Sequence, residues 1–118
     1  MSSKNPLITL EQILNECERT IAWSQSLNKE TFMADIKQKR LFERELEIIG
    51  EAVGRLPSEI TCRYPDVDWM NIAGLRHRII HGYDKIDYDL VWSIISTDIP
   101  PLREKIQRII IEWKSQHE

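Results

Sequence analysis

A chain of 118 residues, 42% hydrophobic and 30% charged, has the composition of one globular domain with its own core. This composition excludes a disordered chain, and no apolar run approaches the ~20 residues that cross a bilayer. A formal net charge of −3 excludes a global field that attracts polyanions, so nucleic acid would need a local basic patch. We expect a single domain over residues 1–118, no membrane partner and a cytoplasmic location, because the N-terminus lacks the apolar core of a signal peptide.

The first predicted helix runs from about Thr9 to Leu27. It begins at Thr9-Leu10-Glu11-Gln12, which fits a capping box. Apolar residues follow at spacings of three and four and form one face: Leu10, Ile13, Leu14, Cys17 and Ile21. Trp23 lies outside this face and is a candidate partner contact.

A second, longer helix is predicted from about Phe32 to Arg55. Its apolar residues alternate at four and three, which is typical of the seam of an antiparallel or dimeric helix pair: Phe42, Leu46, Ile49, Val53 and Leu56. Gly50 and Gly54 lower the helix propensity, so we expect another backbone to approach closely there.

The second half of the chain predicts shorter elements. Pro57 ends the long helix, and Ser58 to Tyr64 form a turn of helix or a loop. Three aspartates are each expected to cap a further helix: Asp68, Asp87 and Asp98. Gly82 is placed to end the helix that Asp68 begins. Pro100 and Pro101 suit the first turn of the last helix. No run is long enough for a strand. The fold class is therefore all-α, an antiparallel helical bundle of four to five main helices.

Two cysteines, Cys17 and Cys62, lie far apart and lack the spacing of metal ligands. We expect two buried free thiols. His77 and His81 have i, i+4 spacing, but only Asp84 or Asp87 could add a ligand nearby, so neither a metal nor another cofactor is expected.

Chemically active side chains gather between Gly74 and Tyr83. Histidine exchanges protons near neutral pH, and arginine offers a fixed charge and a planar donor fork to phosphate. Together they could cleave RNA without a metal, because a base removes the 2′-hydroxyl proton while a cation stabilises the phosphorane. The C-terminal end of a helix, where the dipole is negative, also favours the protonated form of a histidine. The plainer interpretation is a solvated helix end whose cations complement the helix dipole.

Helix geometry constrains this site. Arg76 and His81 are five residues apart, which places them about 140° apart around a regular helix. For both to reach one substrate, either the helix unwinds at His81-Gly82 or two chains bring their copies together.

The residues Arg76, His81 and Tyr83 resemble the Arg-x-x-x-x-His-x-Tyr motif of the HepT-like toxins, a branch of the HEPN superfamily of all-helical ribonucleases. The resemblance extends over roughly residues 8 to 112. It includes Arg44-Glu45-Leu46-Glu47-Ile48-Ile49-Gly50-Glu51-Ala52, Arg55-Leu56-Pro57, Asp68-Trp69 and Val91-Trp92.

The resemblance implies a homodimer and the toxin of a toxin–antitoxin pair, a metal-independent RNA endonuclease. Arg76 and His81 would carry the chemistry. Tyr83 would receive AMP from a minimal nucleotidyltransferase antitoxin (MntA-like), which would block the site. His77 stands where the family commonly has a small polar residue. On charge and proximity alone, Arg78 and Lys85 are candidate contacts to the RNA backbone.

Two other functions remain open from the sequence. The chain could be a non-catalytic helical module that binds a nucleotidyltransferase or a nucleotide, with the motif as its docking surface. It could also be a structural dimerisation domain in which the motif affects stability only.

Overall fold

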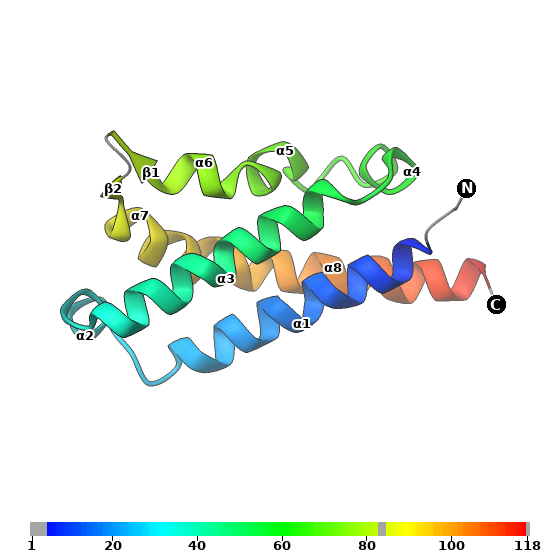
Figure 1. The fold of residues 1–118 in the computed structure, drawn as a ribbon. Helices are drawn as coiled ribbons and strands as arrows, with labels where there is room; N and C mark the ends of the chain where they lie inside the picture. Colours follow the sequence, from blue (N-terminus) through cyan, green and yellow to red (C-terminus); the bar gives the residue numbers. More distant parts are fainter. Residues whose placement is uncertain (1–4, 83–84, 118) are drawn as a thin grey trace.

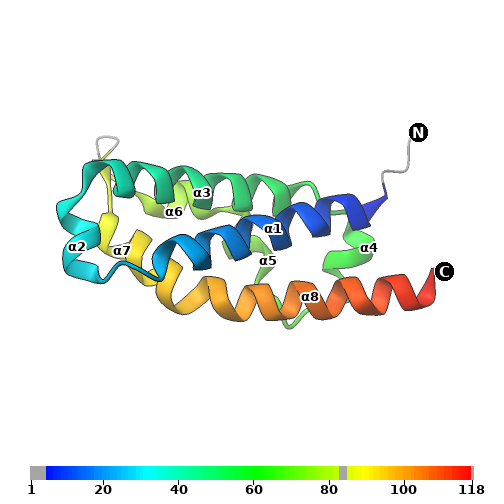
Figure 2. The same ribbon diagram turned by 90° about the horizontal axis from the view of Figure 1, so that it is seen from below.

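The computed structural model describes residues 5–82 and 85–117, and its long helices run side by side (Figures 1 and 2). They are α1 (Pro6–Ser24), α3 (Ile36–Gly54) and α8 (Ile99–Gln116). Helix α1 packs against both α3 and α8 and runs antiparallel to each. The prediction of an all-α antiparallel bundle is therefore confirmed.

Shorter elements complete the bundle. They are α2 (Lys29–Ala34), α4 (Ser58–Thr61), α5 (Trp69–Ala73), α6 (Leu75–Ile79), β1 (Ile80–His81), β2 (Lys85–Ile86), α7 (Tyr88–Ser93) and the π-helical turn η1 (Ile94–Asp98). Helices α4, α5 and α6 follow one another along the side of α3 that faces away from α1 (Figure 1). Strands β1 and β2 form a small antiparallel ladder, which the prediction of no strands missed because each strand is only two residues long.

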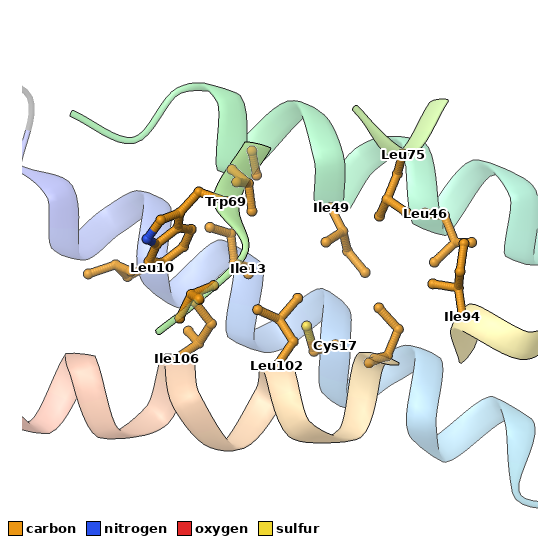
Figure 3. Close-up of a cluster of buried hydrophobic side chains, with 14 of the residues drawn as sticks. Leu10, Ile13, Cys17, Leu46, Ile49, Trp69, Leu75, Ile94, Leu102 and Ile106 are labelled. Atoms are coloured by element: carbon orange, nitrogen blue, oxygen red, sulfur yellow. The ribbon is translucent and has the colours of Figure 1, made fainter. Parts of the chain in front are cut away.

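The core lies between the long helices and is built by the predicted apolar faces. Leu10, Ile13 and Cys17 of α1 meet Ile49 of α3 and Leu102 of α8 in one cluster (Figure 3). Burial raises the pKa of the Cys17 thiol to about 12, with the charges of neighbouring glutamates as smaller causes. Cys17 is thus the buried free thiol that was expected. The same prediction is wrong for Cys62, which is exposed after α4.

Two predicted helix starts are wrong for the same physical reason, an unrecognised cap. Helix α1 begins after Asn5, whose side-chain oxygen accepts the backbone N–H of Leu7, so Thr9 lies inside the helix. The long second helix is interrupted at Asp35. The Asp35 carboxylate accepts the N–H groups of Lys37 and Gln38 and starts α3 as a new helix.

The apolar seam of α3 faces the protomer's own core. Four residues of α3, and Leu56 just after the helix, are between 0% and 8% exposed: Phe42, Leu46, Ile49, Val53 and Leu56. Of the two helix pairings that the sequence leaves open, antiparallel or dimeric, the seam therefore takes part in packing within the protomer. Trp23 is 39% exposed, with its ring edge-to-face against Phe42.

The close backbone approach predicted at the glycines is confirmed for Gly50. A Cβ atom there would lie 2.9 Å from the carbonyl oxygen of Ile72, so α5 rests directly on α3. Gly54 has room, because the nearest atom to its Cβ position is 4.0 Å away on Ala73.

The chain forms the π-helical turn η1 where the sequence predicts that Asp98 caps the last helix. Asp98 makes no side-chain cap bond, and α7 continues through η1 into α8. Pro100 and Pro101 have no N–H to donate to the preceding turn. The backbone N–H of Ile99 instead bonds the carbonyl of Ile94, an i to i+5 bond that carries the chain past the prolines.

Candidate functional site

The residues of the predicted site lie on α6 and the hairpin that follows it. Leu75 and Ile79 are buried and anchor α6 to the core, whereas Arg76, His77 and Arg78 are all exposed. The predicted continuous helix from Asp68 to Gly82 is wrong. It breaks at Gly74, and the Asp68 side chain makes no cap bond but accepts a hydrogen bond from the amide of Asn71.

Helix α6 ends at Ile79, earlier than predicted. Ile80 has extended backbone angles (φ −82°, ψ 124°) and starts β1, in which Ile80 pairs with Ile86 and His81 with Lys85. Gly82 has φ +43°, a left-handed conformation that glycine adopts without steric cost. It therefore serves the turn of the hairpin rather than the stop of the helix.

The hairpin is tied to the helices on both sides. The backbone N–H of Asp87 donates to the carbonyl of Ile79 at 2.7 Å. The Asp87 carboxylate accepts the N–H of Leu90 at 3.0 Å, which confirms Asp87 as the cap of α7. One residue thus closes the hairpin through its backbone and starts the next helix through its side chain.

This geometry removes the obstacle raised by helical spacing. Arg76 belongs to α6 and His81 to β1, so the angle of about 140° that separates them on a regular helix does not apply. The chain has already left the helix one residue before His81. For His81 the structure describes the backbone, and Tyr83 lies outside the described residues.

Arg76 and Arg78 lie on different sides of α6, because residues two positions apart are separated by about 160° around a helix. Arg78 lines an open cleft of about 300 Å³ between α5–α6 and the start of α8, with Lys105 among the residues of the other wall. Arg76 and His77 do not line this cleft. Lys85 is exposed on β2.

One group near the site had no local signal in the sequence. Tyr88, the first residue of α7, donates its O–H to the Glu43 carboxylate of α3 at 2.7 Å. Burial, followed by this hydrogen bond, raises the pKa of Tyr88 to about 12. The Lys39 ammonium lies 5.0 Å from the centre of the Tyr88 ring. Because 45 residues separate Tyr88 from Glu43, only the fold reveals the contact.

A second missed group lies on the opposite side of α3. Glu45 is 5% exposed, and one of its carboxylate oxygens has no hydrogen-bond partner within the described chain. Burial is the main reason that its pKa rises to about 7; a hydrogen bond with Glu16 and the Glu16 charge add to the rise, and Arg19 opposes it. Glu45 is therefore a protonatable group inside the α1–α3 interface rather than part of the site.

Within residues 5–82 and 85–117, no three His, Cys, Asp or Glu side chains come together as a metal-binding group. Every helix of that part of the chain is too short or too polar to traverse a bilayer.

Known proteins resemble this chain over nearly its whole length. Residues 10–109 match the family described as "Ribonuclease HepT-like". A candidate RNase of Caldanaerobacter subterraneus subsp. tengcongensis is 40% identical over 111 residues, which cover 94% of this chain and 99% of that protein. A candidate RNase of Methanocaldococcus jannaschii is 32% identical over 118 residues, or 100% and 98% of the two chains. A candidate ribonuclease HepT of Thermococcus cleftensis is 31% identical over 100 residues, or 85% and 91%. No solved structure gives a significant match.

Proposed function

This chain belongs to the HepT-like ribonuclease family, and on that premise we propose that it is a toxin that cleaves RNA without a metal ion, with Arg76 and His81 as its catalytic residues. The observation that carries the assignment is the early end of α6. It leaves an exposed Arg76 on the helix and puts the backbone of His81 in the adjoining strand, so the spacing of a regular helix no longer holds the two residues apart.

The proposed reaction is a transesterification within the RNA. A base takes the 2′-hydroxyl proton, the 2′-oxygen forms a bond to the neighbouring phosphorus, and the bond from phosphorus to the 5′-oxygen breaks. The leaving 5′-oxygen takes up a proton, which gives a 2′,3′-cyclic phosphate and a 5′-hydroxyl. His81 serves as the acid or base, and Arg76 balances the negative charge that builds on the phosphorane.

A homodimer would let two copies of His81 divide the acid and base roles. Because the apolar seam of α3 is buried in the protomer core, a dimer interface needs another apolar surface. Met70 of α5 is 85% exposed and Ile80 of β1 is 37% exposed, and both flank α6. Their position supports a dimer that brings the two motifs together through the α5–β1 surface.

Regulation by AMP transfer is proposed at Tyr83, two residues after His81. A nucleotidyltransferase antitoxin would transfer AMP from ATP to the tyrosine: the tyrosine oxygen loses its proton and bonds the α-phosphorus, the bond to pyrophosphate breaks, and a phosphodiester results. The added group is bulky and anionic, so it would repel RNA phosphates and occupy the space beside Arg76 and His81. Incubation with the antitoxin and ATP should then add the mass of AMP to the wild type and not to Tyr83→Phe.

The test is cleavage of a labelled RNA in the presence of EDTA. Wild type should cut it and leave cyclic phosphate ends, and Arg76→Ala and His81→Ala should each lose at least 100-fold in rate, as expected for groups that act on the reacting atoms. Arg63→Ala removes a comparable exposed arginine away from the motif and should leave the rate unchanged.

Cleavage that survives in both motif variants would contradict the catalytic assignment. A wild type that cuts no RNA but forms a stable complex with the nucleotidyltransferase would instead favour the non-catalytic helical module.

A further inference from the structure

Positive charge is concentrated in two segments of an otherwise acidic chain. Residues 36–44 hold four Lys or Arg against one Glu, and residues 75–85 hold three against one Asp. All other residues together hold 9 Lys or Arg against 17 Asp or Glu. The second segment contains the proposed catalytic residues, and the first belongs to α3 and has no part in the motif.

The two basic segments lie at the same end of the molecule. Figures 1 and 2 show the start of α3, helix α7 and the β1–β2 hairpin together at the end opposite the last turn of α8. Tyr88 links them, because its ring lies 5.0 Å from Lys39 and its hydroxyl bonds Glu43 of α3. The residue before it, Asp87, bonds Ile79 at the end of α6.

Three cations of the first segment share one side of α3, which we call the α3 basic face: Lys37, Arg40 and Arg44. They stand at i, i+3 and i+7, so they line up along the helix with rises of about 4.5 and 6 Å. All three are exposed. A row of exposed cations suits a polyanion better than a compact anion.

Three carboxylates near this face have partners, whereas Glu51, seven residues after Arg44 on the same side of α3, is exposed and forms no salt bridge among the described residues. Glu43 accepts the Tyr88 hydroxyl, Glu47 pairs with Arg44 at 3.3 Å, and Asp35 accepts backbone N–H groups of its own helix. Within the described residues Lys37 and Arg40 form no salt bridge with any Asp or Glu. These two charges therefore remain available to a ligand.

We propose that the α3 basic face binds phosphates of the RNA backbone. These phosphates belong to the strand that is cut and neighbour the phosphate at the cleavage position. The inference rests on the proposed ribonuclease function and adds a binding track outside the motif. A single strand suits it, because attack by the 2′-oxygen needs a backbone free to rotate and unpaired RNA is the common target of specific recognition. Binding through phosphates makes the contact independent of base sequence and sensitive to salt.

A protein partner with an acidic rim is the rival ligand for the same face. Two aliphatic side chains flank the cations, Ile36 at 56% exposure and Leu41 at 38%. A protein would bury them, whereas a strand held by its phosphates depends on the charges. The distribution of charge over the whole chain and the shared end with the motif favour RNA.

The experiment measures binding of a 12-nucleotide RNA with 2′-O-methyl groups throughout, which cannot be cleaved because the attacking hydroxyl is blocked. Affinity is measured between 50 and 300 mM salt for wild type, Lys37→Gln/Arg40→Gln and Ile36→Ser/Leu41→Ser. The control is Arg108→Gln/Lys114→Gln, which removes two exposed cations of α8 that, unlike Lys37 and Arg40, lie within 4.0 Å of a carboxylate. Circular dichroism melting establishes that each variant is folded.

Loss of two phosphate contacts should lower the slope of log K against log salt by about 1.4, at ~0.7 for each contact to a single strand. That corresponds to roughly 10- to 25-fold weaker binding at 0.1 M salt. The α8 control and Ile36→Ser/Leu41→Ser should keep the wild-type slope. With cleavable RNA, Lys37→Gln/Arg40→Gln should raise KM and leave kcat near wild type.

A slope for Lys37→Gln/Arg40→Gln equal to wild type would overturn the inference. So would an equal loss in the α8 control, because binding would then follow net charge alone. A larger loss in Ile36→Ser/Leu41→Ser than in the charge variant would assign the face to apolar contacts and overturn it as well. These results differ from failure of the proposed function, in which wild type would cut no RNA at all.

Discussion

Replacing Glu45 with glutamine should make folding stability less dependent on pH. Glutamine has nearly the shape of glutamic acid and carries no charge at any pH. In the wild type, the folded-state pKa of Glu45 is about 7, against an ordinary value of 4.5, mainly because the carboxyl group is buried between α1 and α3. Folding therefore favours the protonated form. The stability that this preference contributes is complete below pH 4.5 and is lost as the pH rises to about 7.

The size of the effect follows from the two pKa values. A difference of one pKa unit corresponds to 1.36 kcal/mol, so the interval from 4.5 to about 7 gives an upper limit of about 3 kcal/mol. Water at the edge of the α1–α3 interface and the charge of Arg19 reduce this limit, and we expect about 1–2 kcal/mol. Glu45→Gln should thus gain about that much relative to wild type between pH 5 and pH 8.

Urea unfolding of both proteins at pH 5, 6, 7 and 8 measures the difference. The control is Glu47→Gln on the same helix, where the carboxylate is partly exposed and pairs with Arg44 at 3.3 Å. This variant should show no comparable gain as the pH rises. If the difference between Glu45→Gln and wild type stayed constant from pH 5 to pH 8, Glu45 would not change its protonation in that range and the reasoning would be refuted.

Two further predictions concern the supports of the site. Gly50→Ala should lower the free energy of unfolding by about 1–3 kcal/mol in urea titrations, because its Cβ would meet the Ile72 carbonyl at 2.9 Å. Gly54→Ala, which has room, should be neutral or stabilising. Equal effects of the two substitutions would contradict the close contact at Gly50. Asp87→Ala should lower it by about 1 kcal/mol through loss of the α7 cap, and Asp87→Asn should retain most of that stability; equal losses in both would rule out the cap as the cause.

Much of the scaffold could be predicted because its signals are local and periodic. The apolar residues of α1, α3 and α8 repeat every three or four positions, and they are the ones that the core buries. Gly50 and Asp87 were also predictable, since a glycine inside a helix and an aspartate before one each have few physical explanations. The breaks were harder. Asp35 lies in a pattern whose apolar spacing continues across it, so its role as a cap appears only once the backbone is placed.

The surface that the apolar seam of α3 packs against could not be predicted, for a different reason. Periodicity tells which side of a helix is apolar and gives no information on what covers it. A seam spaced at four and three suits a second chain as well as the rest of the same chain. Here the shorter helices α5, α6 and α7 cover the seam together with α1, so the dimer that we propose would have to use side chains that remain exposed, such as Met70 and Ile80.

The same distinction governs the site. A motif of one arginine and one histidine five residues apart is unproductive on a regular helix, and sequence spacing alone left two remedies, a break or a second chain. The break is present and lies at Ile80, supported by the backbone bond from Asp87 to Ile79 and by the left-handed Gly82. A second chain is therefore not needed to relieve the helical geometry. The remaining role of a second chain would be to supply a second histidine. Variants at Met70 would therefore test dimerisation, and variants at His81 would test catalysis.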